Sequence, residues 1–201
     1  MKNVLISLAL ALSCGFAIAA DIPAHPHILV ETTEGDFKLE LDAKQAPLTV
    51  AHFYGLVTSG FYDGTIFHRV IPNFMIQGGG YVPDLTRKED DRTIPNESGN
   101  GLSNVRGTIA MARLSGPHTA GSQFFINVAD NVQGGDGNGN LDPRKDPVRG
   151  GWGYTVFGVV FEGMEVVDKI VNAETAPNGP GGAPMPVKAV VIKRMSIITY
   201  E

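Results

Sequence analysis

The chain has 201 residues, 43% of them hydrophobic and 18% charged, which is the composition of one globular domain with enough apolar residues for a full core. No internal repeat or second domain is needed to account for the sequence. The formal net charge of −5 argues against nucleic acid as a partner, because nucleic-acid-binding domains are usually basic.

Residues 1–19 differ in composition from the rest of the chain. Lys2 supplies a positive charge, residues 4–12 form an apolar core, and residues 17–19 (Ala-Ile-Ala) form a small-residue cleavage pattern. These features predict a secretory signal peptide that is cleaved after residue 19 or 20. The apolar run is short for a membrane span, and no later run reaches the ~20 residues that a spanning helix needs. We therefore expect no membrane attachment after cleavage.

The single cysteine, Cys14, lies within this segment. The mature chain would therefore contain no thiol and no disulfide, and its stability would depend on packing. Acylation of Cys14, as in a lipoprotein, is the alternative. It is disfavoured because residues 11–13 (Ala-Leu-Ser) lack the usual leucine at the third position before the cysteine.

The next segment leads into the domain and opens its sheet. Residues 20–27 are expected to be a flexible lead-in, and their two histidines are interpreted as a chance pair rather than a metal site. Residues 27–33 and 36–42 predict two paired antiparallel strands around a turn at residues 34–35, because hydrophobic and polar residues alternate along the second strand.

Residues 46–58 predict the first helix. Pro47 suits a first helical turn, apolar residues recur at helical spacing, and the Ser-Gly pair at residues 59–60 ends the pattern. The helix should cover one end of a sheet. His52 falls between the apolar positions, so we expect it to be partly exposed and not to act as a catalytic base.

A central stretch contains one arginine among large apolar residues and ends in three glycines. Alternation predicts one strand at residues 65–70 and a second at residues 74–77. Since alternate residues of a strand point to the same side, Phe67 and Arg69 are expected to share one face.

On the second strand, Met75 and Gln77 share a face by the same alternation. The Arg69 guanidinium and the Gln77 amide would then line one apolar surface. Arginine is rarely buried without a partner, so this setting indicates a concave site open to the carbonyl or amide of a ligand. The alternative is an edge-strand arginine that lies over apolar neighbours with its charge in water.

The rest of the chain is mostly short strands and turns. Residues 83–101 are polar and rich in turn formers, and their charged run at residues 87–92 is expected to be a solvated loop. We expect further strands at residues 107–112, 123–128, 154–161 and 187–198 and a second amphipathic helix at residues 164–171. Many short strands with two helices favour an antiparallel barrel capped at its ends.

Three segments together form a recognisable pattern: F-H-R-V-I-P-N-F-M-I-Q-G-G-G at residues 67–80, G-T-I-A-M-A-R at residues 107–113 and G-S-Q-F-F-I-N at residues 121–127. They resemble the signature of the cyclophilin-type peptidyl-prolyl cis-trans isomerases, in particular the bacterial periplasmic type. The resemblance implies an all-β-dominated domain over residues 28–201, an eight-stranded antiparallel β-barrel capped by two α-helices. It also implies a binding groove on the outside of the barrel.

The activity implied is rotation about the X–Pro bond, which must break amide resonance against a barrier of ~18–20 kcal/mol. This reaction needs no cofactor, metal or nucleophile. Arg69 would donate to the prolyl nitrogen as resonance is lost, and Gln77 would orient Arg69. The resemblance assigns substrate binding to the proline-pocket residues Phe74, Met75, Phe125 and Leu141, to Gln123 and the backbone of Ala112 and Arg113 for the substrate main chain, and to Tyr154.

The chain departs from the family pattern at three positions. Arg113 stands where many relatives have asparagine, and Tyr154 stands where eukaryotic members have histidine and bacterial ones often tyrosine. Asn140 occupies the place before Leu141 where many relatives have tryptophan, and Trp152 lies too far along the chain to be a clean substitute.

Residues 133–151 form an additional loop in which every second residue over residues 136–142 has an oxygen-bearing side chain. This resembles the start of a calcium loop. Leu141 takes the place of the usual glycine and Pro147 that of the closing glutamate, so we expect a flexible Gly/Asn loop and no metal site.

The predicted function is peptidyl-prolyl isomerisation in exported proteins during folding. The partners would be proline-containing polypeptides, and the enzyme would be a periplasmic or secreted monomer. A non-catalytic proline-binding chaperone or adaptor on the same fold is the alternative. A hydrolase that uses His68 and Ser122 is disfavoured, because residues 121–123 lack a nucleophile elbow.

Overall fold

The computed structural model describes residues 22–143 and 151–199. The predicted signal peptide, Cys14 and residues 144–150 of the additional loop lie outside the described residues. The elements are the strands β1 (His27–Thr32), β2 (Asp36–Leu41), β3 (Phe67–Ile71), β4 (Met75–Gly78), β5 (Thr108–Met111), β6 (Phe124–Asn127), β7 (Val156–Glu162), β8 (Thr175–Ala176), β9 (Met185–Pro186) and β10 (Ile192–Ile198), the helices α1 (Pro47–Thr58) and α2 (Met164–Val171), and the short 3-10 helix η2 (Pro180–Gly182).

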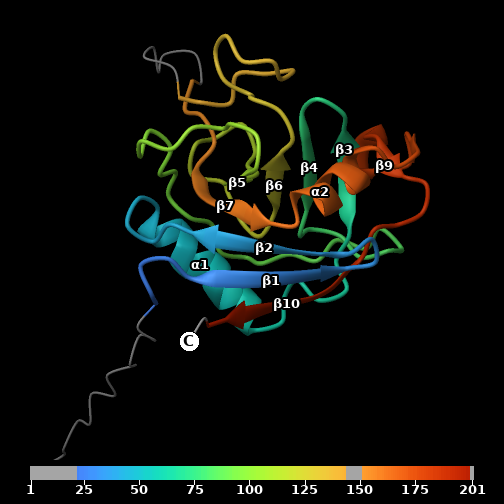
Figure 1. Ribbon diagram of the computed structural model, residues 1–201, viewed down its shortest axis with the longest axis horizontal. Helices are drawn as coiled ribbons and strands as arrows, with labels where there is room; N and C mark the ends of the chain where they lie inside the picture. Colours follow the sequence, from blue (N-terminus) through green and yellow to red (C-terminus); the bar gives the residue numbers. More distant parts are fainter. Residues whose placement is uncertain (1–21, 144–150, 200–201) are drawn as a thin grey trace, which may run out of the picture.

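Within the described residues, eight strands form one antiparallel sheet in the order β10-β1-β2-β7-β5-β6-β4-β3. The sheet curls, so that β1, β2 and β10 run across the view in Figure 1 while β3, β4 and β6 run steeply to them. Its two edges approach where Ile66 and Val191 form an antiparallel bridge and the Ile192 N–H donates to the Thr65 carbonyl at 2.8 Å. The predicted eight-stranded antiparallel barrel with two helices is confirmed.

The predicted hairpin and both predicted helices are present. β1 and β2 pair directly, with Val30 opposite Phe37, and α1 begins with proline in its first turn. α1 lies behind β1 and β10, and α2 lies beside β3 and β4 (Figure 1). No helix in the described part of the chain is both long enough and apolar enough to cross a membrane.

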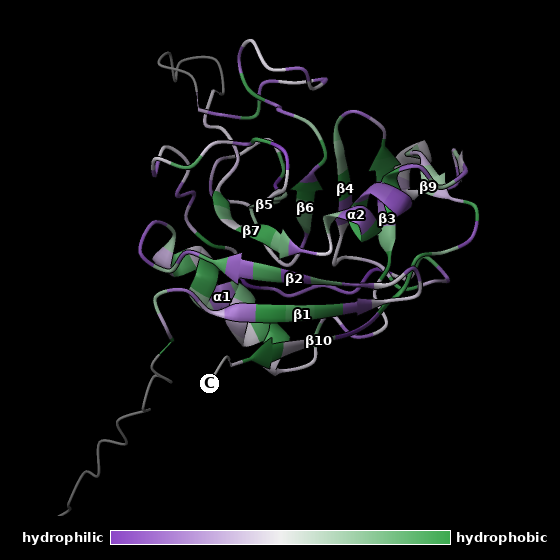
Figure 2. Ribbon diagram, viewed as in Figure 1, coloured by the Kyte–Doolittle hydropathy of each residue, from purple (hydrophilic) through white to green (hydrophobic). Residues whose placement is uncertain are grey.

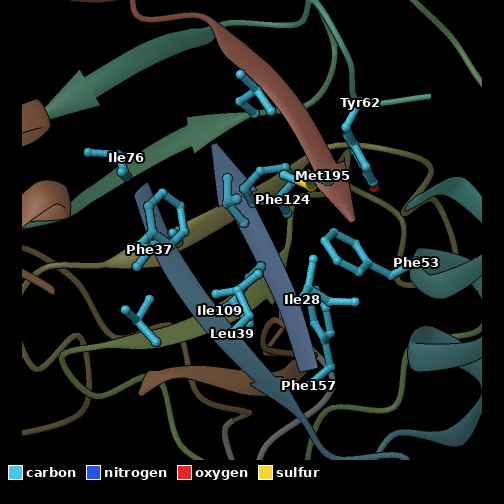
Figure 3. Packing of buried hydrophobic residues seen from close by; sticks show 14 of the residues in the cluster. Ile28, Phe37, Leu39, Phe53, Tyr62, Ile76, Ile109, Phe124, Phe157 and Met195 are labelled. Atoms are coloured by element: carbon cyan, nitrogen blue, oxygen red, sulfur yellow. The ribbon is translucent and has the colours of Figure 1, made fainter. Parts of the chain in front are cut away.

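The barrel interior is filled by large hydrophobic side chains from the sheet and from α1 (Figure 3). Phe53 of α1 lies 5.0 Å from Phe157 of β7 and 5.7 Å from Phe124 of β6, ring centroid to ring centroid. The buried Tyr62 hydroxyl donates to the Ser122 carbonyl at 2.8 Å, which satisfies its polar atom. The edge-to-face contact between Phe53 and Phe124 stabilises the interior beyond the burial of area alone.

One prediction about β3 is wrong: Phe67 and Arg69 do not share a face. Phe67 is completely buried in the interior, whereas Arg69 is partly exposed on the outside. The pairing of β3 with β4 advances from Phe67 opposite Gly78 to Arg69 opposite Gln77, so His68 is the extra residue of a β-bulge. The bulge lets one strand send Phe67 inward and the arginine outward.

Strand boundaries also differ from the prediction, and two of the differences have a cause that the structure shows. β7 begins at Val156 rather than at residue 154, because Tyr154 still belongs to the loop, where its N–H donates to the Leu141 carbonyl at 2.9 Å. The last strand begins at Ile192 rather than at residue 187. Val187 is exposed and its N–H donates to the Glu174 carbonyl at 2.9 Å, beside the short pair of β8 and β9, which the sequence did not indicate.

The segment before β1 has no helix or strand over residues 22–26. Its backbone nonetheless contacts the domain: the Ala24 carbonyl accepts from the Ala43 N–H at 3.0 Å, and the Pro26 carbonyl from the Leu41 N–H at 2.9 Å. Ile22 packs against the interior cluster. This segment therefore continues the edge of the hairpin for several residues.

Candidate active site

A second hydrophobic cluster lies on the outer side of the sheet, and we call it the outer cluster. Its buried members are Met75, Ala110, Phe125 and Val156, and partly buried residues including Phe74, Leu141 and Tyr154 pack against them. β6 separates the two clusters, because Phe124 points into the barrel and Phe125 points out. This strand is hydrophobic along most of its length in Figure 2, as expected for a strand buried on both faces.

The outer cluster borders a cavity of about 170 Å³, which we call the proline cavity after the role that the sequence resemblance predicts for its residues. Its lining is Arg69, Phe74, Met75, Gln77, Ala112, Arg113, Phe125, Leu141 and Tyr154. Every one of these residues was predicted from the sequence. Gln123, the remaining predicted residue, lines an adjoining cavity of about 400 Å³ that shares Gln77, Ala112 and Arg113 with the first. Trp152 is 43% exposed and lines neither cavity.

Three polar side chains that line the two cavities are linked by hydrogen bonds. Arg69 Nη1 donates to Gln77 Oε1 at 3.2 Å, and Gln77 Nε2 donates to Gln123 Oε1 at 2.9 Å. The Arg69 guanidinium also lies 5.8 Å from the ring centre of Phe74. Burial lowers the pKa of Arg69, yet an arginine stays protonated at neutral pH. Gln77 therefore fixes a cationic fork at the wall of the proline cavity.

The triple glycine after Gln77 has a steric cause. A Cβ at Gly80 would lie 2.5 Å from the side chain of Gln123, and a Cβ at Gly79 would lie 2.8 Å from Tyr62. Gly79 also has a φ of 80°, which side-chain-bearing residues rarely adopt. Glycine at these positions leaves room for Gln123 on one side and for the barrel interior on the other.

Arg113 and Tyr154 form one wall of the proline cavity. The Arg113 guanidinium lies 4.4 Å from the ring centre of Tyr154, and its Nε donates to the Gly153 carbonyl at 2.9 Å. The Tyr154 ring meets Phe125 edge to face at 5.6 Å. The tyrosine is thus held between a cation and an aromatic edge, which orients it toward the cavity.

The main chain of Ala112 is only partly available to a ligand. Its N–H donates to the Gln123 carbonyl at 2.9 Å, which continues the pairing of β5 and β6. A substrate main chain at this position must therefore use other backbone groups than the Ala112 N–H.

The described part of the additional loop packs on the proline cavity. The Leu141 N–H donates to the Asn131 carbonyl at 2.8 Å, and a Cβ at Gly139 would lie 3.1 Å from the Phe74 ring. The carboxylates that suggested a calcium loop bind other groups: Asp136 accepts from the Asp130 N–H, and Asp142 accepts from Asn104. Within residues 22–143 and 151–199, no group of three or more His, Cys, Asp or Glu side chains could hold a metal ion.

His52 was predicted to be partly exposed, and this is wrong. Its relative exposure is 9%, and its Nε2 lies 3.0 Å from the Gly121 carbonyl and 3.7 Å from the Asp90 carboxylate. The loops that carry these two groups pack over α1. Helical spacing within α1 cannot predict burial by residues so distant in the sequence. The resulting burial lowers the pKa of His52.

His68 is buried, at 3% relative exposure, although no pattern in the sequence predicted this. Its ring lies 4.7 Å from that of Tyr81, and its buried Nδ1 has no hydrogen-bond partner among the described residues. Burial lowers the pKa of His68 to about 4, so it is neutral at physiological pH. In the described residues no hydrogen bond joins it to the Ser122 side chain, so the two do not form a nucleophile and base pair.

Comparison with known proteins gives the same family throughout. The family model described as cyclophilin type peptidyl-prolyl cis-trans isomerase/CLD matches residues 27–197. Peptidyl-prolyl cis-trans isomerase A of Dickeya dadantii is 44% identical over 98% of both chains. Peptidyl-prolyl cis-trans isomerase B of Escherichia coli is 42% identical over 85% of this chain and 98% of its own.

Solved structures agree in fold. The crystal structure of a cyclophilin type isomerase of Cryptosporidium parvum superposes with a TM-score of 0.65 at 27% identity, over 88% of this chain and 99% of its own. A second structure of that protein, determined in the presence of the dipeptide Ala-Pro, superposes with a TM-score of 0.64. The chain belongs to the cyclophilin-type peptidyl-prolyl cis-trans isomerase family and is an isomerase of X–Pro peptide bonds.

Proposed function

We propose that the proline cavity holds the substrate's prolyl ring and that Arg69 stabilises the twisted amide. The observation that supports this most strongly is the position of Arg69: it lines an apolar cavity, is fixed by Gln77 and has no carboxylate within ion-pair distance in the described part of the chain. Its remaining N–H groups are thus available to a ligand.

The chemistry follows from what the twist does to the prolyl nitrogen. In the planar amide its lone pair is delocalised into the carbonyl, and it becomes an acceptor only as resonance is lost. A guanidinium N–H placed at that nitrogen therefore binds the twisted state more tightly than either planar state, which is what lowers the barrier. Neither proton transfer nor a covalent step is required.

The required acceleration can be divided between the Arg69 guanidinium and the walls of the proline cavity. Uncatalysed rotation takes tens to hundreds of seconds, so turnover in milliseconds needs about 10⁴–10⁵-fold acceleration, or roughly 5.5–7 kcal/mol. A preorganised charged donor in a site that excludes water supplies about 3–4 kcal/mol. The remainder would come from holding the ring against Phe125, Met75 and Leu141 and from moving the amide out of water.

The substrate main chain would lie along the edge formed by Gln123 and Arg113. Gln123 Oε1 accepts from Gln77 Nε2, so its amide is oriented before a substrate arrives. Since the Ala112 N–H is already used, the Arg113 backbone is the better candidate for the main-chain contact.

The test is an NMR-exchange isomerase assay on an Ala-Pro peptide with the Arg69→Ala variant. We expect kcat/KM to fall by about 10²–10³-fold, the factor for one charged transition-state donor. Circular dichroism and urea unfolding control for the fold. Near-normal turnover by a folded Arg69→Ala variant would contradict the assignment of Arg69.

We also propose that the substrates are exported proteins and that the mature enzyme is a periplasmic or secreted monomer. The support is the leader-like composition of residues 1–19. N-terminal sequencing of the exported protein should find Ala20 or Asp21 first, and sedimentation should give one chain per particle. An intact Met1, or lipid on Cys14, would contradict the leader assignment.

A further inference from the structure

Arg113 places a second guanidinium at the proline cavity, and the proposed function uses only its main chain. The side chain is fixed by three contacts. It lies over Tyr154, its Nε donates to the Gly153 carbonyl, and its Nη1 donates to the Leu114 carbonyl at 2.9 Å. A side chain that is already ordered loses little conformational entropy when it binds a ligand.

This guanidinium also lacks a charged partner. In the described part of the chain no carboxylate lies within ion-pair distance of Arg113 or of Arg69, whereas Arg92 and Arg106 each pair with one, at 2.8 and 2.7 Å. The Nη2 group of Arg113 donates no hydrogen bond within those residues. Among the residues that the structure describes, a protein with a net charge of −5 thus keeps two cations without a carboxylate partner at one cavity.

The position of Arg113 relative to the substrate follows from the proposed position of the prolyl nitrogen beside Arg69. That nitrogen is bonded to the carbonyl carbon of the preceding residue, so the preceding residue lies on the side of Arg69 and Gln77. Beyond Gln77 the proline cavity passes into the adjoining cavity, and Arg113 lines both. The residue before the proline would therefore sit beside the Arg113 guanidinium.

The adjoining cavity does not cancel this positive charge. Its lining includes Glu89, which pairs with Arg87, and Asp90, which pairs with Arg92. Asp91 is exposed, so solvent screens its charge, and Lys88 adds a further positive charge to the lining. Arg113 remains the cation at the junction of the two cavities.

We infer that Arg113 makes this isomerase favour substrates with a carboxylate side chain, Glu or Asp, immediately before the proline. This inference rests on the proposed placement of the prolyl ring. A guanidinium binds a carboxylate through charge-assisted hydrogen bonds. The pair would exist in the planar and the twisted states alike, so it should lower KM and leave kcat unchanged.

The experiment compares three peptides that differ only in the residue before proline: Glu, Gln and Ala. With wild-type protein at about 20 mM salt, KM for Glu-Pro should be about three- to five-fold lower than for Gln-Pro, as expected for a partly exposed ion pair. The difference should fade at about 0.5 M salt because the Debye length shortens. Equal KM values for Glu-Pro and Gln-Pro would overturn the inference, whatever the behaviour of any variant.

Two variants locate the effect. Arg113→Gln should bring the Glu-Pro to Gln-Pro ratio of KM close to one. Arg194→Gln removes the same charge from an exposed position on β10 and should keep the wild-type ratio. Loss of the preference in both variants would mean that net charge, not Arg113, causes it. Failure of the wild type to turn over Ala-Pro would contradict the proposed function itself, whereas normal Ala-Pro turnover without a Glu preference would contradict only the role of Arg113.

Discussion

The barrel interior and the outer cluster are built by the same strands, yet only the interior is closed by the protein. Phe124 and Phe125 are neighbours on β6, and both are nearly inaccessible to solvent. Phe124 is surrounded by Phe53, Tyr62 and Phe67, whereas Phe125 borders an open cavity. Burial alone therefore does not distinguish structural from functional aromatic residues. The two rings differ in what they face: Phe124 faces other side chains, and Phe125 faces an open cavity.

The largest effect should come from breaking the interior. Phe124→Ala removes a ring with three aromatic neighbours that cannot all move in to refill the space. We expect the free energy of unfolding to fall by about 3–5 kcal/mol, measured by urea denaturation. Among molecules that remain folded, KM for a proline peptide should stay near the wild-type value. A tenfold rise in KM at small loss of stability would reverse the assignment of the two clusters.

His68 lies at the bulge between the two regions and should give a pH-dependent effect of intermediate size. Its pKa is lowered to about 4 in the folded protein from the ordinary 6.5, mainly by burial, so the unfolded chain binds the proton at higher pH. Its contribution to stability is full above about pH 6.5 and is lost as the pH falls toward 4, by about 3 kcal/mol in all.

Urea unfolding of the wild type and of His68→Gln should be compared between pH 4.5 and 7. The carboxylates titrate in both proteins, so the difference between them isolates the contribution of His68 to stability. Between pH 7 and pH 4.5 the free energy of unfolding should fall by about 2–3 kcal/mol less in His68→Gln than in the wild type. Parallel pH profiles for the two proteins would show that His68 does not titrate as its burial implies.

The smallest effect on stability should come from the outer cluster. Phe125→Ala enlarges a cavity that water already reaches, so we expect a loss of only about 1–3 kcal/mol in the free energy of unfolding. KM should rise about tenfold because the prolyl ring loses one wall. Equal losses of stability for Phe124→Ala and Phe125→Ala would remove the distinction between the clusters.

Most of the fold and nearly all of the site could be predicted, because they depend on local pattern and on a long motif. The hairpin alternates cleanly and α1 has proline at its start and Ser-Gly at its end. Pairing between β3, β4 and β6, whose segments belong to the motif, brings together Arg69, Met75, Gln77 and Phe125 of the proline cavity.

The errors arise where a residue's environment is set by distant segments. A bulge at His68 reverses the face expected for Phe67, and alternation cannot anticipate one extra residue. His52 is buried by loops that follow it by some forty and seventy residues in the sequence. The hydrogen bond between Gln123 and Gln77 likewise depends on tertiary packing.

The most direct test of the account is whether Arg69 acts on the twisted state, and Arg69→Lys is the sharpest variant because it keeps the charge. A lysine ammonium cannot reproduce the fixed fork that Gln77 holds, so kcat/KM should still fall by at least about tenfold. The dissociation constant of a ground-state proline peptide, measured by NMR titration, should change by less than about threefold. The account predicts this separation of turnover from affinity. A parallel loss of both, or wild-type turnover by Arg69→Lys, would contradict it.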